Sequence, residues 1–297
     1  MKKYLMLLFL AVLLTPPLAA QVKLQVVTQS LEKDLTGIRK VVINGKKADV
    51  IIHGWTKTGV SAQIRRVAKH PDRDVAELEL NFMLYKIGAQ DGVLTLTNGF
   101  RIPQNRRSVQ SQLKTVFELW VPENTGLQID NSFGDITLAN LRGETSVTFE
   151  FGKLSLSDLT GKLTIQSEYG DLEATDVGGQ LVCKAEKADI ILRQLSGTAR
   201  IESRYGKLYV RPAERLSSLT VSAARTEIYL YTRRVDDFQY EVETTYSTLK
   251  VPDSHQPFVR KLRFDHQPAG NRPAVRIDGS YSPVTLIQSA GDMLIKN

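Results

Sequence analysis

Cysteine, tryptophan and histidine are scarce in this sequence, and their scarcity excludes several classes of site. The 297 residues include one cysteine, two tryptophans and four histidines. Cys183 has no partner for an internal disulfide, so a hydrophobic core must stabilise the fold. No two histidines have the spacing of metal ligands. They are His53, His70, His255 and His266. We therefore expect no metal site and no cofactor.

Long apolar runs are also absent, apart from one near the start of the chain. Lys2 and Lys3 precede the apolar run Leu5 to Leu14, and small residues follow it up to Ala20. This layout predicts a secretory signal peptide over residues 1–20, cleaved after Ala20. An uncleaved anchor is the alternative, but a bilayer span needs roughly 20 apolar residues. We expect no transmembrane span after signal removal, and export to the periplasm, the cell surface or the medium.

A strong charge of one sign is lacking as well. The net charge is +7, and without Lys2 and Lys3 the chain has 37 basic against 32 acidic residues, a net charge of +5. The surplus is scattered, whereas nucleic-acid binding requires clustered basic residues. We expect no nucleic-acid partner. The mild surplus favours acidic polymers, so envelope glycans or surface proteins are the expected partners.

What the sequence does contain is an 18-residue repeat between residues 130 and 211. Glycine recurs at this spacing in two series that lie nine residues out of phase. The first series is Gly134, Gly152, Gly170 and Gly206, with Ala188 in the gap, and the second is Gly143, Gly161, Gly179 and Gly197. Fixed internal periodicity indicates stacked structural units. Each unit therefore contains two halves, and each half is short enough for one β-strand.

Apolar residues alternate within each half, which predicts strands with one buried face. The first half has the columns Ile136, Leu154, Leu172, Ile190 and Leu208; Leu138, Leu156, Ala174, Leu192 and Val210; and Leu141, Leu159, Val177 and Leu195. The second half has Val147, Ile165, Cys183 and Ile201, beside Thr145, Leu163, Leu181 and Ala199. Cys183 is therefore expected to be buried and inert.

Polar residues mark the bends of each unit. Asn140, Asp158 and Asp176 lie three residues before the second-series glycines. Their side chains bond to local backbone in turns, and glycine accepts a positive φ, so these positions predict corners. Calcium binding is the alternative reading of an acidic column. Gln194 and Pro212 continue the column, and no Asp-rich glycine loop surrounds it, so the turn reading is favoured.

Two architectures place two strands in 18 residues: a β-solenoid, in which residue i stacks on i+18, and an antiparallel meander. A column of aromatic residues discriminates between them. Phe133, Phe151, Tyr169 and Tyr205 are spaced by 18 or 36, with Lys187 in the gap, and the positions nine residues later are not aromatic. In-register stacking of like residues favours the solenoid. The predicted class is all-β, a β-solenoid (right-handed β-helix-like) with 18-residue two-strand rungs.

Outside the repeat the pattern is less regular. Further strands are predicted over 60–66, 77–85, 93–97 and 115–121, a loop over 101–112, and no helix. Residues 252–273 are rich in Pro, His and charge, which predicts a loop or insertion. We therefore divide the chain into a signal peptide (1–20), an N-terminal β region (21–121) and a β-solenoid repeat region (122–297) with an insertion near 252–273.

The repeat region resembles a known group of bacterial proteins. The segments that carry the likeness are ELWVP (118–122), SFGDITL (132–138) and LRG (141–143). They are similar to the families called "putative adhesin", which are catalogued as domains of unknown function. The likeness is strong over 118–211 and weaker over 40–60 and 244–286. It implies a β-helix fold in an exported protein, and an adhesive role.

Extracellular β-helices also include polysaccharide lyases and hydrolases, so catalysis is a genuine alternative. Such enzymes need paired carboxylates or a base beside a cation. Asp135, Asp171 and Asp189 share a column, but Lys153 and Lys207 interrupt it, as on a solvated face whose charges pair across rungs. Nucleophile motifs of the Gly-x-Ser-x-Gly kind are absent. We predict no catalytic residues.

Three functional hypotheses follow. The first is a non-catalytic envelope or secreted protein, an adhesin or surface scaffold. The second is a carbohydrate-active β-helix enzyme, and the third is a periplasmic regulatory or stress-response module. The aromatic column is an exposed strip for stacking sugars if it faces solvent, or a cap on the core at a corner.

Overall fold

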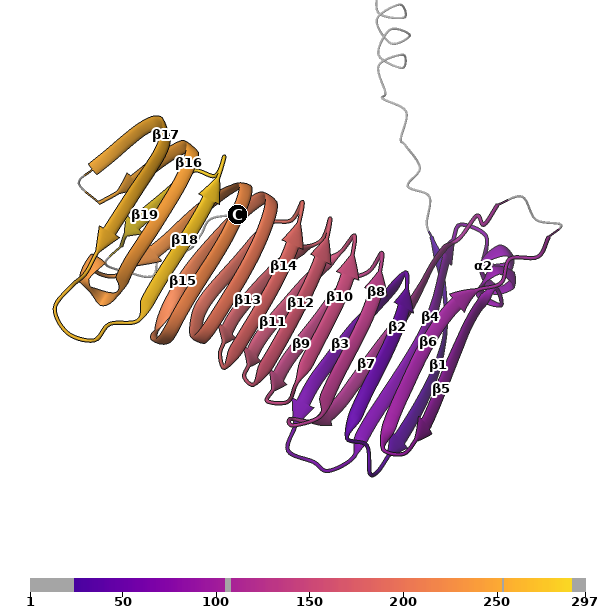
Figure 1. The fold of residues 1–297 in the computed structure, drawn as a ribbon. Coiled ribbons are helices and arrows are strands. Elements are labelled where there is room, and N and C mark those ends of the chain that lie inside the picture. The colour runs from indigo at the N-terminus through magenta and orange to yellow at the C-terminus, as the bar shows by residue number, and fades with distance from the viewer. Residues whose placement is uncertain (1–23, 105–107, 253, 290–297) are drawn as a thin grey trace, which may run out of the picture.

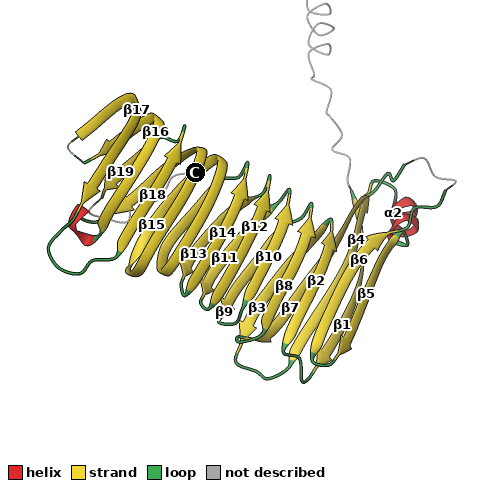
Figure 2. Ribbon diagram, viewed as in Figure 1, coloured by secondary structure: helices red, strands yellow, loops and turns green. Residues whose placement is uncertain are grey.

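Strands account for nearly all of the regular structure (Figures 1 and 2). The computed structural model describes residues 24–104, 108–252 and 254–289, with the backbone alone for 254–259. The predicted signal peptide and its cleavage site lie outside the described residues. Within them, α2 (Arg73–Leu80) is the only α-helix, and η2 (Val235–Asp237) is a short 3-10 turn. The all-β class is confirmed. No helix in the described part is long and apolar enough to cross a membrane.

The centre of the molecule consists of two parallel sheets, and each rung contributes one strand to each sheet. The first sheet contains β8 (Gly126–Ser132), β10 (Thr145–Glu150), β12 (Lys162–Glu168), β14 (Gln180–Glu186) and part of β15 (Ile190–Thr232). The second contains β9 (Ile136–Leu141), β11 (Lys153–Leu159), β13 (Asp171–Val177) and another part of β15.

Where these strands pair with one another, each paired residue lies opposite the residue 18 positions away, as with Val147, Ile165 and Cys183. The stacking register predicted from the repeat is therefore confirmed over this region, and the antiparallel meander is excluded. The alternation is also confirmed, because the columns that begin at Ile136, Leu138 and Val147 are buried. Cys183 is 1% exposed.

The N-terminal strands continue both sheets rather than forming a separate layer. β2 (Lys40–Lys46) pairs in parallel with β8, and β3 (Ala48–Trp55) pairs in parallel with β9. β6 (Val93–Phe100) and β7 (Gln112–Pro122) extend the two sheets in the same sense. One hydrophobic core runs from Ile38 to Leu286. The division of the chain at residue 121 stays a prediction.

Antiparallel strands close both ends of the stack. At one end, β4 (Val60–His70) pairs with β7, β1 (Gln25–Leu35) with β4, and β5 (Met83–Gln90) with β6. At the other end, β18 (Ala274–Ser280) and β19 (Val284–Gln288) add a parallel rung, and β16 (Gln239–Val251) pairs with both. β17 (Ser254–His266) then pairs with β16 in the antiparallel sense. The prediction of a loop over 252–273 was therefore wrong for Ser254–His266, whereas residues 267–273 have no strand or helix.

The strand predicted over 77–85 was wrong for its first part. Residues 77–80 belong to α2, residues 81–82 form a turn, and only residues 83–85 belong to a strand, β5. Asp72 begins the helix, because its side chain accepts the backbone N–H of Asp74 at 2.9 Å. On its inner side the helix buries Ala76, Leu80 and Glu79. A polar first turn and a short apolar face therefore produce one helix in a chain of strands.

Candidate binding surface

The most distinctive surface feature is a row of residues at one corner of successive rungs. We call it the corner ladder. In spatial order it comprises Lys47, Phe133, Phe151, Tyr169, Lys187, Tyr205, Arg225, Tyr281 and Tyr246. All nine have left-handed backbone, with φ between 50° and 59°. The ladder follows one edge of the stack, where the chain turns between the two sheets.

Left-handed backbone is unusual for these residue types. For a residue other than glycine it costs roughly 1–2 kcal/mol, and asparagine tolerates it better than aromatic residues do. At the first three rungs the residue before the first-series glycine has the positive φ, and Gly152 allows close approach of the neighbouring rung. A Cβ on Gly152 would lie 2.3 Å from the Gly134 carbonyl oxygen. Some gain from the aromatic side chains must offset the strain.

The opposite corner conforms to the sequence-based expectation. Asn140, Asp158 and Asp176 have φ of 58°, 52° and 60°. Gly161 and Gly179, three residues after the last two, also have positive φ. Short polar side chains and glycine are the residues that tolerate this conformation best. Both corners therefore require left-handed backbone, which short polar residues and glycine adopt at one corner and mainly aromatic and cationic residues adopt at the other.

Stacking of neighbouring rings provides the offsetting gain at the first corner. The centroids of Phe133 and Phe151 are 4.8 Å apart with planes 4° from parallel, and those of Phe151 and Tyr169 are 5.0 Å apart at 7°. Tyr246 and Tyr281 stack at 5.2 Å further along. An aromatic pair contributes about 0.5–1.5 kcal/mol beyond the area it buries. Even so, the six aromatic residues of the ladder are 36–54% exposed.

Cations occupy the ladder positions that lack a ring. The Lys187 ammonium lies 4.5 Å from the Tyr169 ring centroid and donates to the Tyr169 hydroxyl at 2.8 Å, which raises the pKa of Lys187. Arg225 lies over the rings of Tyr205 and Tyr281 and donates to the Tyr205 hydroxyl at 3.0 Å. These are cation–π contacts. Rings and cations therefore form one continuous, exposed row.

This geometry decides between the two readings of the aromatic column. The rings face solvent, so they do not cap the core. Five of the six rings stack on a neighbouring ring of the row, Phe151 on both sides, so those faces are not open to a sugar. The row presents ring edges, tyrosine hydroxyls and cationic groups to the solvent. An extended partner lying along this edge of the stack would meet those groups in sequence.

The carboxylates on the neighbouring face are already engaged. Asp135 accepts the backbone N–H of Lys153, Asp171 that of Asp189, and Asp189 that of Lys207, at 2.8–2.9 Å. Each aspartate thus joins two rungs. Glu173 forms ion pairs with Lys153 and Arg193, and these hydrogen bonds hold the pKa of its carboxyl below the usual value. The general acid of a glycosidase needs the opposite shift.

The histidines are held in separate local contacts. His53 stacks on Trp120, His70 contacts the backbone of Asp72, and His266 pairs with Asp236 at 2.8 Å. The side chain of His255 is outside the described part. Among the side chains that the structure describes, no group of three or more His, Cys, Asp or Glu residues is placed to hold a metal ion.

Sequence reasoning placed the aromatic members within the repeat in one column, and it found that the segments around Arg225, Tyr246 and Tyr281 resemble the repeat without adding them to that column. Lys47 lies 86 residues before Phe133, and Arg225 follows Tyr205 by 20 residues rather than 18. The only available signal was the flanking pattern. Lys47 precedes Ala48-Asp49-Val50, much as Lys187 precedes Ala188-Asp189-Ile190.

Solved structures similar to this chain include three of low sequence identity and low TM-score. A "putative adhesin" from Bacteroides fragilis is 12% identical, with a TM-score of 0.38 over 87% of this chain and 97% of that chain. A "putative adhesin" from Parabacteroides distasonis is 11% identical, with a TM-score of 0.38 over 89% and 97%. A "putative lipid binding protein" from the same species is 10% identical, with a TM-score of 0.35 over 88% and 97%.

Curated proteins gave no match to this sequence. A family model described as "Toastrack DUF4097", a domain of unknown function, matches residues 38–296. That range includes both the N-terminal strands and the repeat region, and it agrees with the resemblance that the motifs of the repeat suggested. The chain therefore belongs to the Toastrack DUF4097 family.

Proposed function

We propose that this protein is an exported, non-catalytic β-solenoid of the right-handed type, which acts in the cell envelope or outside the cell as an adhesin or surface scaffold. The corner ladder is its contact surface for an envelope glycan or a surface protein. The observation that carries this proposal is the continuity of the ladder, because strained, exposed aromatic residues recur rung after rung where asparagine or glycine would be less costly.

The chemistry of the ladder suits recognition. Tyrosine and arginine are enriched where proteins contact partners, because they offer large contact area together with hydrogen-bonding groups. The ladder combines such groups with the ammonium groups of Lys47 and Lys187. A straight row of this kind complements an extended chain better than a compact ligand. The cationic members favour a partner that carries negative charge.

Binding can be tested with variants that keep the backbone conformation. Tyr169→Asn and Lys187→Asn, combined in one protein, remove a ring and a cation while placing at each corner a residue that tolerates left-handed φ. Asp176→Asn is the matched control, since Asp176 has φ of 60° at the opposite corner. Labelled protein lacking residues 1–20 is applied to an array of neutral and acidic envelope polysaccharides and to intact cells.

We expect the ladder variant to lose at least about tenfold in binding, as expected when hot-spot residues are removed. The Asp176→Asn control should bind like the wild type. Equal loss in both proteins would contradict the role of the ladder. Release of reducing sugar from any bound polysaccharide would contradict the non-catalytic assignment and favour the carbohydrate-active enzyme. Retention of the protein in the cytoplasm would contradict export.

A further inference from the structure

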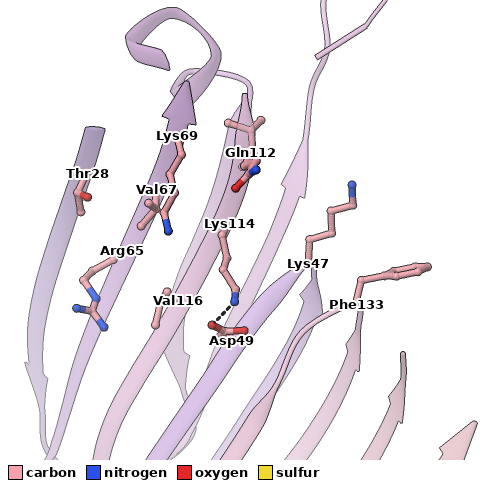
Figure 3. A pocket seen from close by; sticks show the side chains of 11 residues that line it. Thr28, Lys47, Asp49, Arg65, Val67, Lys69, Gln112, Lys114, Val116 and Phe133 are labelled. Atoms are coloured by element: carbon pink, nitrogen blue, oxygen red, sulfur yellow. Dashed lines mark ion pairs between the residues drawn. The ribbon is translucent and has the colours of Figure 1, made fainter. Parts of the chain in front are cut away.

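A pocket of about 590 Å³ lies on the outer face of the sheet near the N-terminal end (Figure 3). Strands β1, β3, β4 and β7 form its floor, and the corner at Lys47 and Phe133 forms one rim. The volume is within the range of small-ligand sites, roughly 300–1,000 Å³. Phe133 and Lys47 also belong to the corner ladder, and Figure 3 shows the Phe133 ring at the rim, directed away from Asp49.

Positive charge dominates the lining. It includes four cationic side chains, those of Lys47, Arg65, Lys69 and Lys114, and one carboxylate, that of Asp49. The four cationic residues are spread over 68 positions of the sequence. The pairing of β3 and β4 with β7 brings them to one place on the sheet. The lining contains no histidine.

Two of the cations are paired and two are available. Lys114 contacts Asp49 at 2.5 Å, and Arg65 contacts Glu118 at 2.9 Å. Within the described part of the chain no carboxylate pairs with Lys47 or Lys69. The Nε of Arg65 is shielded from solvent and has no hydrogen-bond acceptor there. The pocket therefore holds cationic donors in excess of its own acceptors.

We propose that this pocket binds a phosphate dianion, either free or carried on a soluble sugar. Lysine ammonium groups act as point charges that suit the several oxygens of phosphate, whereas planar carboxylates suit the fork of arginine. A single carboxylate would balance only part of the positive surplus of the lining. A phosphate monoester has a charge of about −1.5 to −2 at pH 7 and balances more of it. The pocket shares Lys47 and Phe133 with the corner ladder, but binding of phosphate in it does not require that a polymer bind along the ladder.

Binding of a phosphate dianion is expected to strengthen as the pH rises. Its second pKa is about 6, so the dianionic fraction grows as the pH rises from 5 to 7.5. The groups that face the pocket are the four cations, Asp49, and Glu118 behind Arg65, with no histidine in the lining. Affinity should therefore rise with pH over this interval, and it should fall with added salt.

Isothermal titration of the chain lacking residues 1–20 tests the proposal, with inorganic phosphate as one probe and glucose 6-phosphate as another. Glucose alone is the control for the sugar. Lys47→Gln combined with Lys69→Gln should weaken the binding of either phosphate probe about tenfold or more. Lys86→Gln is the matched control, because Lys86 lies on edge strand β5, outside the pocket, and likewise has no ion-pair partner in the described part.

Binding by one or both phosphate probes, weakened by the double variant and not by the control, supports the proposal and identifies the source of the phosphate. Three results would overturn it: neither phosphate probe binds, glucose binds as well as glucose 6-phosphate, or Lys86→Gln weakens binding as much as the double variant. Unchanged thermal unfolding temperatures of the variants exclude loss of fold as the cause.

Discussion

At the scale of single residues, the corner ladder shows how a repeat can maintain an unfavourable backbone conformation. Phe151 has φ of 50°, a region that phenylalanine rarely adopts. Its ring lies between those of Phe133 and Tyr169. Each rung places a ring beside the ring of the next rung. The favourable free energy of stacking is therefore gained at each step along the row, and it offsets the free energy that the left-handed backbone costs at each residue.

Substitutions at Phe151 should reverse the usual order of alanine and glycine in a strand region. Both remove the stacking, but only Phe151→Ala keeps the left-handed strain, so Phe151→Gly should be the more stable by about 1 kcal/mol. At Ser155, an outward position of β11 without positive φ, alanine should be the more stable. Urea denaturation of the four variants measures the free energies of unfolding. The same order at both sites would contradict the strain argument.

Cys183 should be inert in the folded protein. Burial raises the pKa of its thiol to about 12, so the reactive thiolate is absent at physiological pH. A thiol reagent at pH 8 should label the unfolded chain and leave the native chain unlabelled for hours. Because the folded pKa is the higher, stability that is present below about pH 9 is lost as the pH rises toward 12.

Substitution of Cys183 should distinguish burial from polarity. Cys183→Val keeps the volume and should be nearly neutral, whereas Cys183→Ser buries a hydroxyl without a designed partner and should cost about 1–3 kcal/mol. Rapid labelling of the native protein, or equal stability of the two variants, would contradict the buried position.

At the scale of elements, the spacing between rungs is set by contacts of backbone against backbone. A Cβ at Gly152 would meet the Gly134 carbonyl oxygen, and both belong to backbone that cannot move independently. Gly152→Ala should therefore destabilise the protein by about 1–3 kcal/mol, as overpacking does. Gly99 in β6 has open space around its Cα, so Gly99→Ala should leave stability unchanged or slightly raised. Equal effects of the two in thermal unfolding would contradict this reading.

Ion pairs across rungs should make stability depend on acid pH. The bonds from Lys153 and Arg193 lower the pKa of Glu173, so its contribution is present above the unfolded pKa of about 4.5 and lost as the pH falls through the folded value. Glu173→Gln should flatten the stability profile below pH 4.5. Glu173→Lys places a third cation beside two others and should cost about 1 kcal/mol at neutral pH. Denaturant midpoints measured from pH 3 to 7 are the test.

The repeat predicted its own strands well because one environment recurs along each column. Leu154 and Leu172 pair in register, and both are buried. Elements outside the repeat lack that redundancy. Leu78, Leu80 and Phe82 alternate with polar residues, as in a strand. This alternation predicted a strand over 77–85, although Asp72 is a residue type that begins helices. The segment of β17 is rich in Pro, His and charge, and this composition predicted a loop. An edge strand tolerates such a composition, because one side of its backbone makes no ladder hydrogen bonds.

The ladder and the pocket were predictable to different degrees. The aromatic column is visible in the sequence, but its exposure and its left-handed backbone are not, since both depend on which side of the turn faces the core. The pocket was not predictable at all. Lys69 and Lys114 approach each other through the antiparallel pairing of β4 with β7, and no periodicity encodes that pairing.

At the scale of the whole molecule, the stack ends in strands that pair on one side only within the described structure. β1, β5 and β17 are these edge strands. Unpaired edges invite association with other chains, and charged side chains oppose it. On β17, Lys261 and Arg263 form ion pairs with Glu243 and Glu241 of β16. β17 also returns the chain to the side from which β18 can run parallel to β16.

Removal of those charges should promote self-association. Lys261→Val combined with Arg263→Val turns the edge into an apolar β-branched strand, and sedimentation velocity should then show larger species as concentration rises. Lys184→Val is the matched control, because Lys184 also forms an ion pair but lies on β14, which has strands on both sides. Association of the control to the same extent would assign the effect to surface hydrophobicity rather than to the open edge.

The parallel pairing of i with i+18 also has a mechanical consequence. Main-chain hydrogen bonds in a sheet lie across the strands, so here they point along the axis of the stack. A force that pulls the two ends of the stack apart acts on successive rungs in series, and the rung with the weakest bonding opens first. Each 18-residue rung that opens releases about 60 Å of extended chain. Under tension, the protein would lengthen in steps and dissipate work at each one, while the rungs that remain closed keep their surfaces intact.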